Sequence, residues 1–265
     1  FGLFPVLCYG TIKNLDLTGE LTVSANNLSG GSCQADAGML VGTVLSSTIQ
    51  NVTVNGKIYS PGTLTSKGRL SVGGVCGYAF ADMGASVVIE NAVVNVDADI
   101  SAEANTSNGI SSVMYGGVVG FSTNNRQVDA GPVFIQNCIN NGDMNVNAGR
   151  CGGIIATAYY GTNIVDCVNN GNQVFTNARS GMTGGIASNL SYSNMTNCVN
   201  NGNIDATASG YNGRIGGLVS YITGVSTISE GGNYGIVNTL STAGNGQYRG
   251  LLWAYLSSNQ TYVYD

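Results

Sequence analysis

The chain has 265 residues and a formal net charge of −5, and only 9% of its residues are charged. No basic run suggests a nucleic-acid partner, and no stretch approaches the roughly 18 uninterrupted apolar residues of a transmembrane helix. Glycine contributes 40 residues but proline only 3, and 43% of the chain is hydrophobic, which excludes both collagen and a disordered linker.

A short piece made of glycine followed by aliphatic residues recurs along the whole chain. Its copies are separated by about 32 to 43 residues, and a period in this range is typical of a solenoid. We therefore predict one domain over residues 1–265, built of about eight coils. The coils are expected to begin near Gly2, Gly38, Gly74, Gly117, Gly153, Gly185, Gly217 and Gly250. Because the sequence starts at Phe1 without a signal-like segment, we expect it to be part of a longer chain or assembly.

A second recurring piece lies between these markers. Its copies begin at Ile12, Ile49, Ile89, Ile135, Ile164, Met195 and Ile228. The aliphatic runs are short, rich in β-branched residues and bounded by Gly and Asn, so they favour strands over helices. We expect about three short strands in each repeat, each paired with the equivalent strand of the next repeat. The predicted fold is all-β, a single-stranded parallel β-helix, with the right-handed sense that crossover connections favour.

Stacking of equivalent residues places the cysteines of the second piece in a column of small apolar side chains. The members of this column are Leu15, Val52, Ala92, Cys138, Cys167, Cys198 and Gly231. We place the column inside the coil and predict packed free thiols. Disulfides between coils are the alternative, but parallel side chains in register suit their dihedral angle less well.

Two residues further on, the equivalent position changes from aliphatic residues to asparagine. This column contains Leu17, Val54, Val94, Asn140, Asn169, Asn200 and Asn233. Inward amides can be satisfied by the amides above and below, so we predict an asparagine ladder rather than a set of sugar ligands. The glycines that follow are expected to occupy positive-φ turns; they are Gly142, Gly171, Gly202 and Gly235.

The sequence offers no cofactor or metal site. It has no histidine and no Cys-x-x-Cys motif, which makes a zinc site improbable. The Gly-Gly pieces lack the Lys-Ser/Thr and the helix that a phosphate-binding loop requires.

The pentapeptides at Gly117–Phe121 and Gly217–Tyr221 resemble the GLUG motif. The Ile-x-Asn-Cys-x-Asn-x-Gly copies are similar to repeats that accompany this motif in large surface proteins of bacteria and some protists. The resemblance extends from Gly2 to about Tyr255 and implies an exported, surface-associated, adhesin-like β-helix. It defines no active site. We therefore predict an extracellular or cell-surface structural protein, a building block of a surface layer, fibre or filament, which contacts itself or other chains through uncapped coil ends.

Two other functions are considered beside this one. A glycan-binding module would use aromatic side chains of the loops, since tyrosine stacks on sugars and donates a hydrogen bond; these rings could equally cover the corners of the coil. The candidates are Tyr78, Tyr115, Phe121, Tyr159, Tyr160, Tyr192 and Tyr211. A polysaccharide hydrolase or lyase would need two carboxylates on one face. Asp97 and Asp99 alternate on one strand and are the best candidates, but we favour a solvated strand edge and predict no enzyme.

Overall fold

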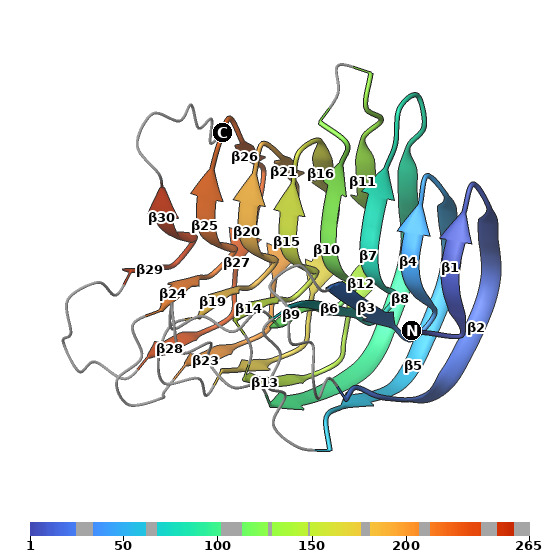
Figure 1. The fold of residues 1–265 in the computed structure, drawn as a ribbon. Coiled ribbons are helices and arrows are strands. Elements are labelled where there is room, and N and C mark those ends of the chain that lie inside the picture. The colour runs from blue at the N-terminus through green and yellow to red at the C-terminus, as the bar shows by residue number, and fades with distance from the viewer. Residues whose placement is uncertain are drawn as a thin grey trace.

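The computed structural model describes residues 1–24, 34–61, 68–101, 113–126, 129–147, 149–175, 181–206, 213–239 and 248–256. Within these ranges every element is a strand and none is a helix. All pairs of strands are parallel, and the one antiparallel contact is the isolated bridge between Met83 and Ala130. The prediction of an all-β chain of parallel strands is confirmed, and the arrangement is compatible with a β-helix (Figure 1).

The strands form three sheets, which we call A, B and C. Sheet A contains eight strands side by side. They are β1 (Phe4–Cys8), β4 (Val41–Leu45), β7 (Cys76–Ala81), β10 (Val119–Asn124), β15 (Ile155–Tyr159), β20 (Ala187–Ser191), β25 (Val219–Thr223) and β30 (Trp253–Leu256).

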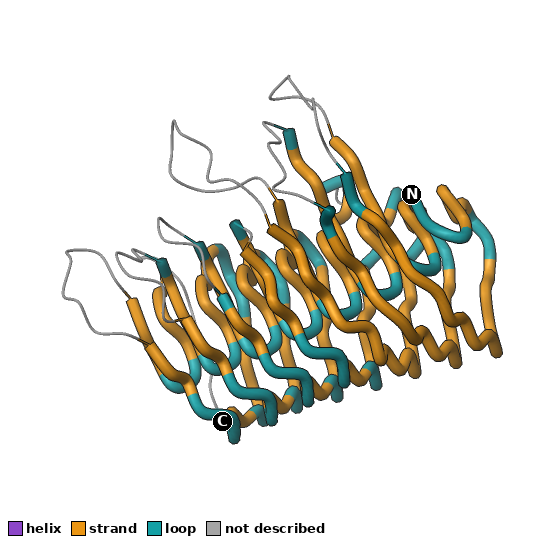
Figure 2. Tube along the Cα trace, turned by 90° about the horizontal axis from the view of Figure 1, so that it is seen from below, coloured by secondary structure: helices purple, strands orange, loops and turns teal. Residues whose placement is uncertain are grey.

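Sheet C contains seven strands, each of which leads through a short turn into a strand of sheet A. They are β3 (Gln34–Gly38), β6 (Arg69–Gly73), β9 (Val113–Gly116), β14 (Arg150–Gly152), β19 (Met182–Gly184), β24 (Arg214–Gly216) and β29 (Tyr248–Gly250). One passage of the chain through sheets C, A and B makes one repeat, and successive repeats lie side by side in Figure 2.

Sheet B contains the remaining 15 strands. Three of them are long, namely β2 (Thr11–Thr22), β5 (Thr48–Tyr59) and β8 (Val87–Ser101). The later repeats replace each long strand by three short ones. These are β11 (Val133–Gln136), β12 (Ile139–Asn140), β13 (Met144–Asn147), β16 (Thr162–Val165), β17 (Val168–Asn169), β18 (Gln173–Val174), β21 (Asn194–Thr196), β22 (Val199–Asn200), β23 (Ile204–Ala206), β26 (Thr227–Ser229), β27 (Gly232–Asn233) and β28 (Val237–Thr239).

The change from long to short strands coincides with the change from aliphatic residues to asparagine in sheet B. Val94 continues strand β8 without interruption, whereas the equivalent Asn140 ends strand β12. The amide of Asn140 donates to the carbonyl oxygen of Gly142 at 3.2 Å. Such a local bond from side chain to backbone competes with the strand ladder, and it bends the chain out of the strand.

The positive-φ positions differ from those expected. Gly142, Gly171, Gly202 and Gly235 do not have positive φ. The left-handed conformation belongs instead to the residue before the cysteine column, as at Asn51 (φ 53°), Asn137 (φ 53°) and Asn197 (φ 50°). Asparagine tolerates this region because its short amide bonds locally. The glycines allow neighbouring backbones to approach closely, because a Cβ on Gly142 would collide with the carbonyl of Val96.

The pairing of sheet C also fixes the alignment of the Gly-Gly pieces. Gly38 pairs with Gly73, and Gly216 pairs with Gly250. Gly38 and Gly250 are therefore equivalent to the first glycine of the other Gly-Gly pieces, whereas the spacing in the sequence aligned them with the second glycine.

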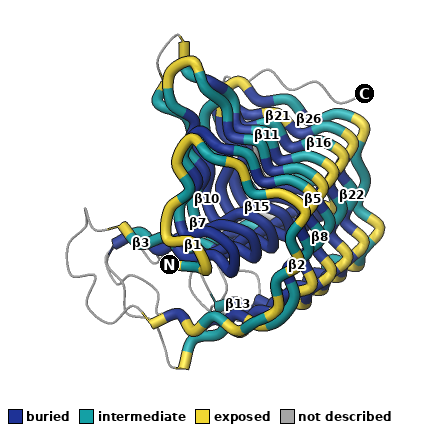
Figure 3. Tube along the Cα trace, turned by 90° about the vertical axis from the view of Figure 1, so that its right-hand side faces the viewer, coloured by how far each residue is buried: buried dark blue, intermediate teal, exposed yellow. Residues whose placement is uncertain are grey.

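The interior is a continuous apolar core enclosed by the three sheets (Figure 3). It is filled mainly by small aliphatic side chains, for example Ile49, Ile89, Ile135 and Ile164, which stack on one another in successive repeats of sheet B. Identical residues in register bury apolar area in every repeat at about 25 cal/mol per Å², so the core grows in proportion to the number of repeats.

Candidate binding site at the corner of sheets A and C

The inner asparagines form a chain of side-chain hydrogen bonds along the stack. Nδ2 of Asn140 donates to Oδ1 of Asn169 at 2.8 Å, Asn169 donates to Asn200 at 2.7 Å, and Asn200 donates to Asn233 at 2.7 Å. Each amide also donates to the carbonyl of the glycine two residues on. The first three amides are fully buried, so they hold repeats together and are out of reach of a ligand.

The ladder has an unsatisfied end. Oδ1 of Asn140 is buried and has no hydrogen-bond partner, because its neighbour in the preceding repeat is Val94. An unpaired buried acceptor costs about 1–3 kcal/mol. The start of the ladder therefore costs free energy of folding, which the hydrogen bonds between the later amides offset.

Glycine on the facing turn is a steric requirement of the ladder. A Cβ on Gly117 would lie 2.6 Å from Cγ of Asn140, and one on Gly153 would lie 2.4 Å from Cγ of Asn169. The second glycine of each Gly-Gly pair thus leaves room for an amide in sheet B.

The cysteine column consists of free thiols in this structure. Cys138, Cys167 and Cys198 are fully buried, and each thiol donates to backbone carbonyls, as Cys167 does to Ile135 at 3.4 Å and to Val165 at 3.3 Å. Burial raises the pKa of the Cys167 thiol well above its ordinary value. These thiols act as small core side chains.

A further asparagine ladder lies on the outer surface and was not expected. Asn141 donates to Asn95 at 2.8 Å, Asn170 donates to Asn141 at 2.8 Å, and Asn201 donates to Asn170 at 2.9 Å. The second Asn of each Asn-Asn-Gly copy carries this signal, since it recurs at the same spacing as the inner one.

The aromatic candidates occupy three kinds of position. Tyr115 is fully buried, which corrects its assignment to the surface: it is the residue before a Gly-Gly pair, a position that points into the core. Phe121 is 7% exposed, whereas Tyr192 is 48% exposed. Tyr78, Tyr159 and Tyr160 are half-buried, and Tyr211 lies outside the described residues.

The remaining rings form a continuous series of contacts across successive repeats, which we call the aromatic series. Its members are Phe80, Tyr78, Phe121, Tyr159, Tyr160 and Tyr192, with neighbouring ring centroids 4.9–6.0 Å apart. Tyr160 and Tyr192 are stacked with an interplanar angle of 8°. Aromatic pairs at such distances add stability beyond the area that they bury.

The end of the series lies on a tight turn after sheet A. Tyr160 and Tyr192 have φ values of 41° and 50°, and the equivalent residue of the next repeat is Gly224 (φ 66°). A Cβ on Gly224 would lie 2.4 Å from the Tyr192 ring. The turn therefore directs these rings along the stack.

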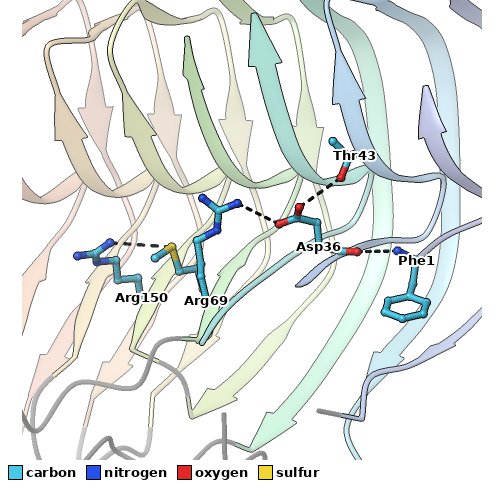
Figure 4. A network of polar contacts seen from close by, with 6 residues as sticks. Phe1, Asp36, Thr43, Arg69 and Arg150 are labelled. Carbon is cyan, nitrogen blue, oxygen red and sulfur yellow. Dashed lines mark hydrogen bonds and ion pairs between the residues drawn. The ribbon is translucent and has the colours of Figure 1, made fainter. Parts of the chain in front are cut away.

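Outward side chains of sheets A and C contact each other across the turn that joins the sheets. We call this surface the A–C corner. Its sheet C column is Asp36, Ser71, Met114, Arg150, Met182 and Arg214, and its sheet A column is Thr43, Tyr78, Phe121, Thr157, Asn189 and Tyr221. Figure 4 shows Asp36, Arg69 and Arg150 rising from sheet C toward the strands of sheet A.

Arginines cover ring faces in this corner. The guanidinium of Arg69 lies 4.6 Å from the ring centroid of Tyr78 and 4.4 Å from that of Phe121, and it forms an ion pair with Asp36 at 3.4 Å. Arg214 lies 4.2 Å over Tyr221. These cation–π contacts hold the guanidinium groups in place. Burial raises the pKa of Asp36, although the charge of Arg69 acts in the opposite direction.

The arginines of the A–C corner were not predicted from the sequence. Arg150 and Arg214 each stand two residues before a Gly-Gly pair, and this shared position is the signal that could have found them. They face Thr157 and Tyr221 seven residues later in the chain, because the turn between sheets C and A folds the two outward columns onto each other.

The acidic candidates are partners of backbone and amide groups. Oδ1 of Asp97 accepts from the backbone N–H of Asp143 at 2.9 Å, and Oδ1 of Asp99 accepts from the amide of Asn145 at 3.2 Å.

In the part of the chain that the structure describes, no group of three or more Cys, Asp or Glu side chains is placed to hold a metal ion. The same residues include no helix that could cross a membrane.

Comparison of the chain with protein-family models, curated proteins and solved structures gave no match.

Two valine substitutions test the inner ladder. Asn169→Val leaves Oδ1 of Asn200 unpaired while Oδ1 of Asn140 stays unpaired, whereas Asn140→Val removes one unpaired oxygen and creates another at Asn169. We expect Asn169→Val to lower the free energy of unfolding by about 1–3 kcal/mol more than Asn140→Val does. Equilibrium urea unfolding measures the difference, and equal losses would contradict the ladder.

Alkylation tests the cysteine positions. Burial raises the pKa of Cys151 to about 12 and also raises that of Cys167, so both thiols stay protonated and covered at pH 8.5. We expect iodoacetamide to modify the exposed Cys8 in the native protein and to spare Cys76, Cys138, Cys151, Cys167 and Cys198 until denaturant is added. Peptide mass mapping reads the result, and native modification of Cys167 would be inconsistent with the structure.

Proposed function

We propose that the chain is a single-stranded, right-handed parallel β-helix of about eight coils, and that it acts as an extracellular, adhesin-like structural protein. In this proposal its outer aromatic face binds glycan chains. The proposal places the chain with the GLUG-motif repeat proteins of cell surfaces, which the Gly117–Phe121 pentapeptide resembles.

The ladders support the structural part of the proposal. The inner amides, the outer amides and the thiols all bond within the stack, most of them to the equivalent or neighbouring residues of the next repeat. Repeats that stabilise their neighbours in this way produce an extended scaffold whose length depends on the number of repeats. A protein that displays a binding face away from a cell surface requires such a scaffold.

The aromatic series is the observation that carries the binding part. It crosses sheet A from Phe80 to Tyr192, and its most exposed ring lies at the turn after β20. Tyrosines combine an apolar ring with a hydroxyl, which suits the mixed apolar and polar surface of a sugar. A series that runs along the stack fits an extended chain better than a small compact ligand.

The first repeat favours contact with further β-strands. Strand β1 pairs only with β4 and strand β2 only with β5, so each has one unpaired edge among the described residues. Leu3, Phe4 and Val6 are 41–59% exposed beside this edge. An open apolar edge is a template for strand addition, and contact with the same or another chain there remains part of the proposal.

A glycan array with a matched pair of tyrosine variants tests the proposed function. Tyr192→Asn removes the exposed ring while keeping a residue that tolerates positive φ, and Tyr234→Asn removes a tyrosine that is 77% exposed on the sheet B side. We expect the wild type to bind at least one glycan class. Tyr192→Asn should bind it about threefold to tenfold more weakly, and Tyr234→Asn should bind it normally.

An array without any bound glycan would refute the binding part of the proposal. Equal binding by Tyr192→Asn and the wild type would show that the exposed end of the aromatic series takes no part in glycan binding.

A further inference from the structure

The outer side of the Ile-x-Asn-Cys-x-Asn-x-Gly copies has a regular pattern that the proposed function does not use. In each copy the first Asn and the last two x residues point outward, because they alternate with the buried Cys and Asn. These residues form three outward columns on sheet B, which we call the sheet B strip. From β8 to β22 its columns are Asn91, Asn137, Asp166 and Asn197; Val93, Ile139, Val168 and Val199; and Asn95, Asn141, Asn170 and Asn201.

The two outer columns of the strip present amides at the surface. Their residues are exposed, and all are asparagine except Asp166. Asn141 donates one Nδ2 proton to Asn95 at 2.8 Å and accepts one from Asn170 at 2.8 Å. A primary amide has two protons to donate and two lone pairs that accept. An amide inside the ladder therefore still has one donor and one acceptor for groups outside the protein.

The middle column of the strip is aliphatic. Val93, Ile139, Val168 and Val199 stack in register and are half-buried. The strip thus has an apolar centre with a row of amides along each edge, and this order repeats from strand to strand at about 4.8 Å. The exposed rows run along the stack beside β8 and β22 in Figure 3.

The strip is too narrow for a folded protein partner. Its outer columns are four residues apart, which corresponds to at most about 13 Å, and four repeats at about 4.8 Å each give an area of roughly 250 Å². A stable protein–protein interface buries about 800 Å² on each partner. The strip has instead the dimensions of one extended chain.

The charges around the strip favour a neutral ligand. Asp166 lies within the strip, and Glu90 and Asp97 lie beside it on sheet B. The described cations of this sheet are Lys13 and Lys57, in the first two repeats. An anionic polymer would be repelled by the carboxylates of this face.

An extended β-1,4-linked glucan has the complementary pattern. Its rings carry C–H groups on both faces, and their equatorial hydroxyls lie along the two edges of the chain. One sugar of such a chain is nearly as long as one strand spacing, so successive sugars meet successive repeats. Alternate sugars are turned over, and an amide suits either orientation because it both donates and accepts.

We propose that the sheet B strip binds a neutral β-1,4-linked polysaccharide that lies along the stack. The C–H faces of the sugars pack on the middle column, and their hydroxyls form hydrogen bonds with the amides of the two outer columns. This inference goes beyond the proposed function, because the strip lies on sheet B and shares no residue with the aromatic series.

The test compares two neutral glucose hexamers that differ in linkage. Cellohexaose, which is β-1,4-linked and extended, and laminarihexaose, which is β-1,3-linked and curved, are titrated into protein labelled with ¹⁵N at asparagine. We expect cellohexaose to bind at least about tenfold more tightly. Its binding should shift the Nδ2 resonances of Asn141 and Asn170 and leave that of Asn189 in sheet A unchanged.

A matched pair of alanine variants locates the contact. Asn170→Ala removes an amide of the strip, whereas Asn172→Ala removes an exposed amide beyond Gly171 that also bonds to the preceding repeat. We expect Asn170→Ala to weaken the binding of cellohexaose about fivefold or more, and Asn172→Ala to bind it as the wild type does.

Equal binding of the two hexamers, or binding of neither, would overturn the inference. Equal weakening by the two alanine variants would also overturn it, because the loss would then follow from the stack and not from the strip. If Tyr192→Asn abolishes the binding of cellohexaose and Asn170→Ala leaves it intact, the hexamer binds at the aromatic series, which overturns this inference and supports the proposed function. If Asn170→Ala lowers the melting temperature, the comparison of the hexamers and the amide shifts in the wild type still decide.

Discussion

Hydrogen bonding of each repeat to the next, in register, is the constraint on which the rest of this structure depends. The strands of one repeat do not pair with one another. Their backbone N–H and C=O groups therefore form hydrogen bonds with the equivalent strand of the neighbouring repeat. Side chains then follow the backbone: an amide at one position meets an amide at the same position, as Asn169 meets Asn140 and Asn200. The same register stacks the thiols, aliphatic residues, arginines and rings in columns.

This constraint couples residues that are distant in sequence. An inner amide at Asn169 requires glycine at position 153 on the facing turn, because any Cβ there would collide with it. Where the column is aliphatic, as at Val94, the strand runs on and the bend disappears. The unpaired oxygen of Asn140 marks the junction between these two solutions. The A–C corner follows the same rule, since its two outward columns face each other only when sheets C and A keep one register.

Features that recur at a constant spacing could be predicted from the sequence. Predictions were wrong at single positions whose conformation or burial the repeat pattern alone does not determine. The all-β class and the columns of Cys138 and Asn140 could be aligned because their copies recur at nearly constant spacing. Glycine was expected at positive φ from its general preference, but here it allows close approach, and asparagine adopts the left-handed conformation. Tyr115 was assigned to an exposed loop, although its position is otherwise held by core residues such as Val72 and Cys151. The arginines were not predicted because their column in sheet C contacts the rings of sheet A only after the turn between the two sheets has folded.

The exchange of side-chain amide protons measures the inner ladder most directly. In protein labelled with ¹⁵N at asparagine, the account predicts that the Nδ2 protons of Asn169 and Asn200 exchange with deuterated solvent as slowly as the backbone amides of β17 and β22. Exposed amides such as that of Asn51 should exchange far faster. If the side chains of Asn169 and Asn200 exchanged as fast as that of Asn51, the stack would not be held together as described here.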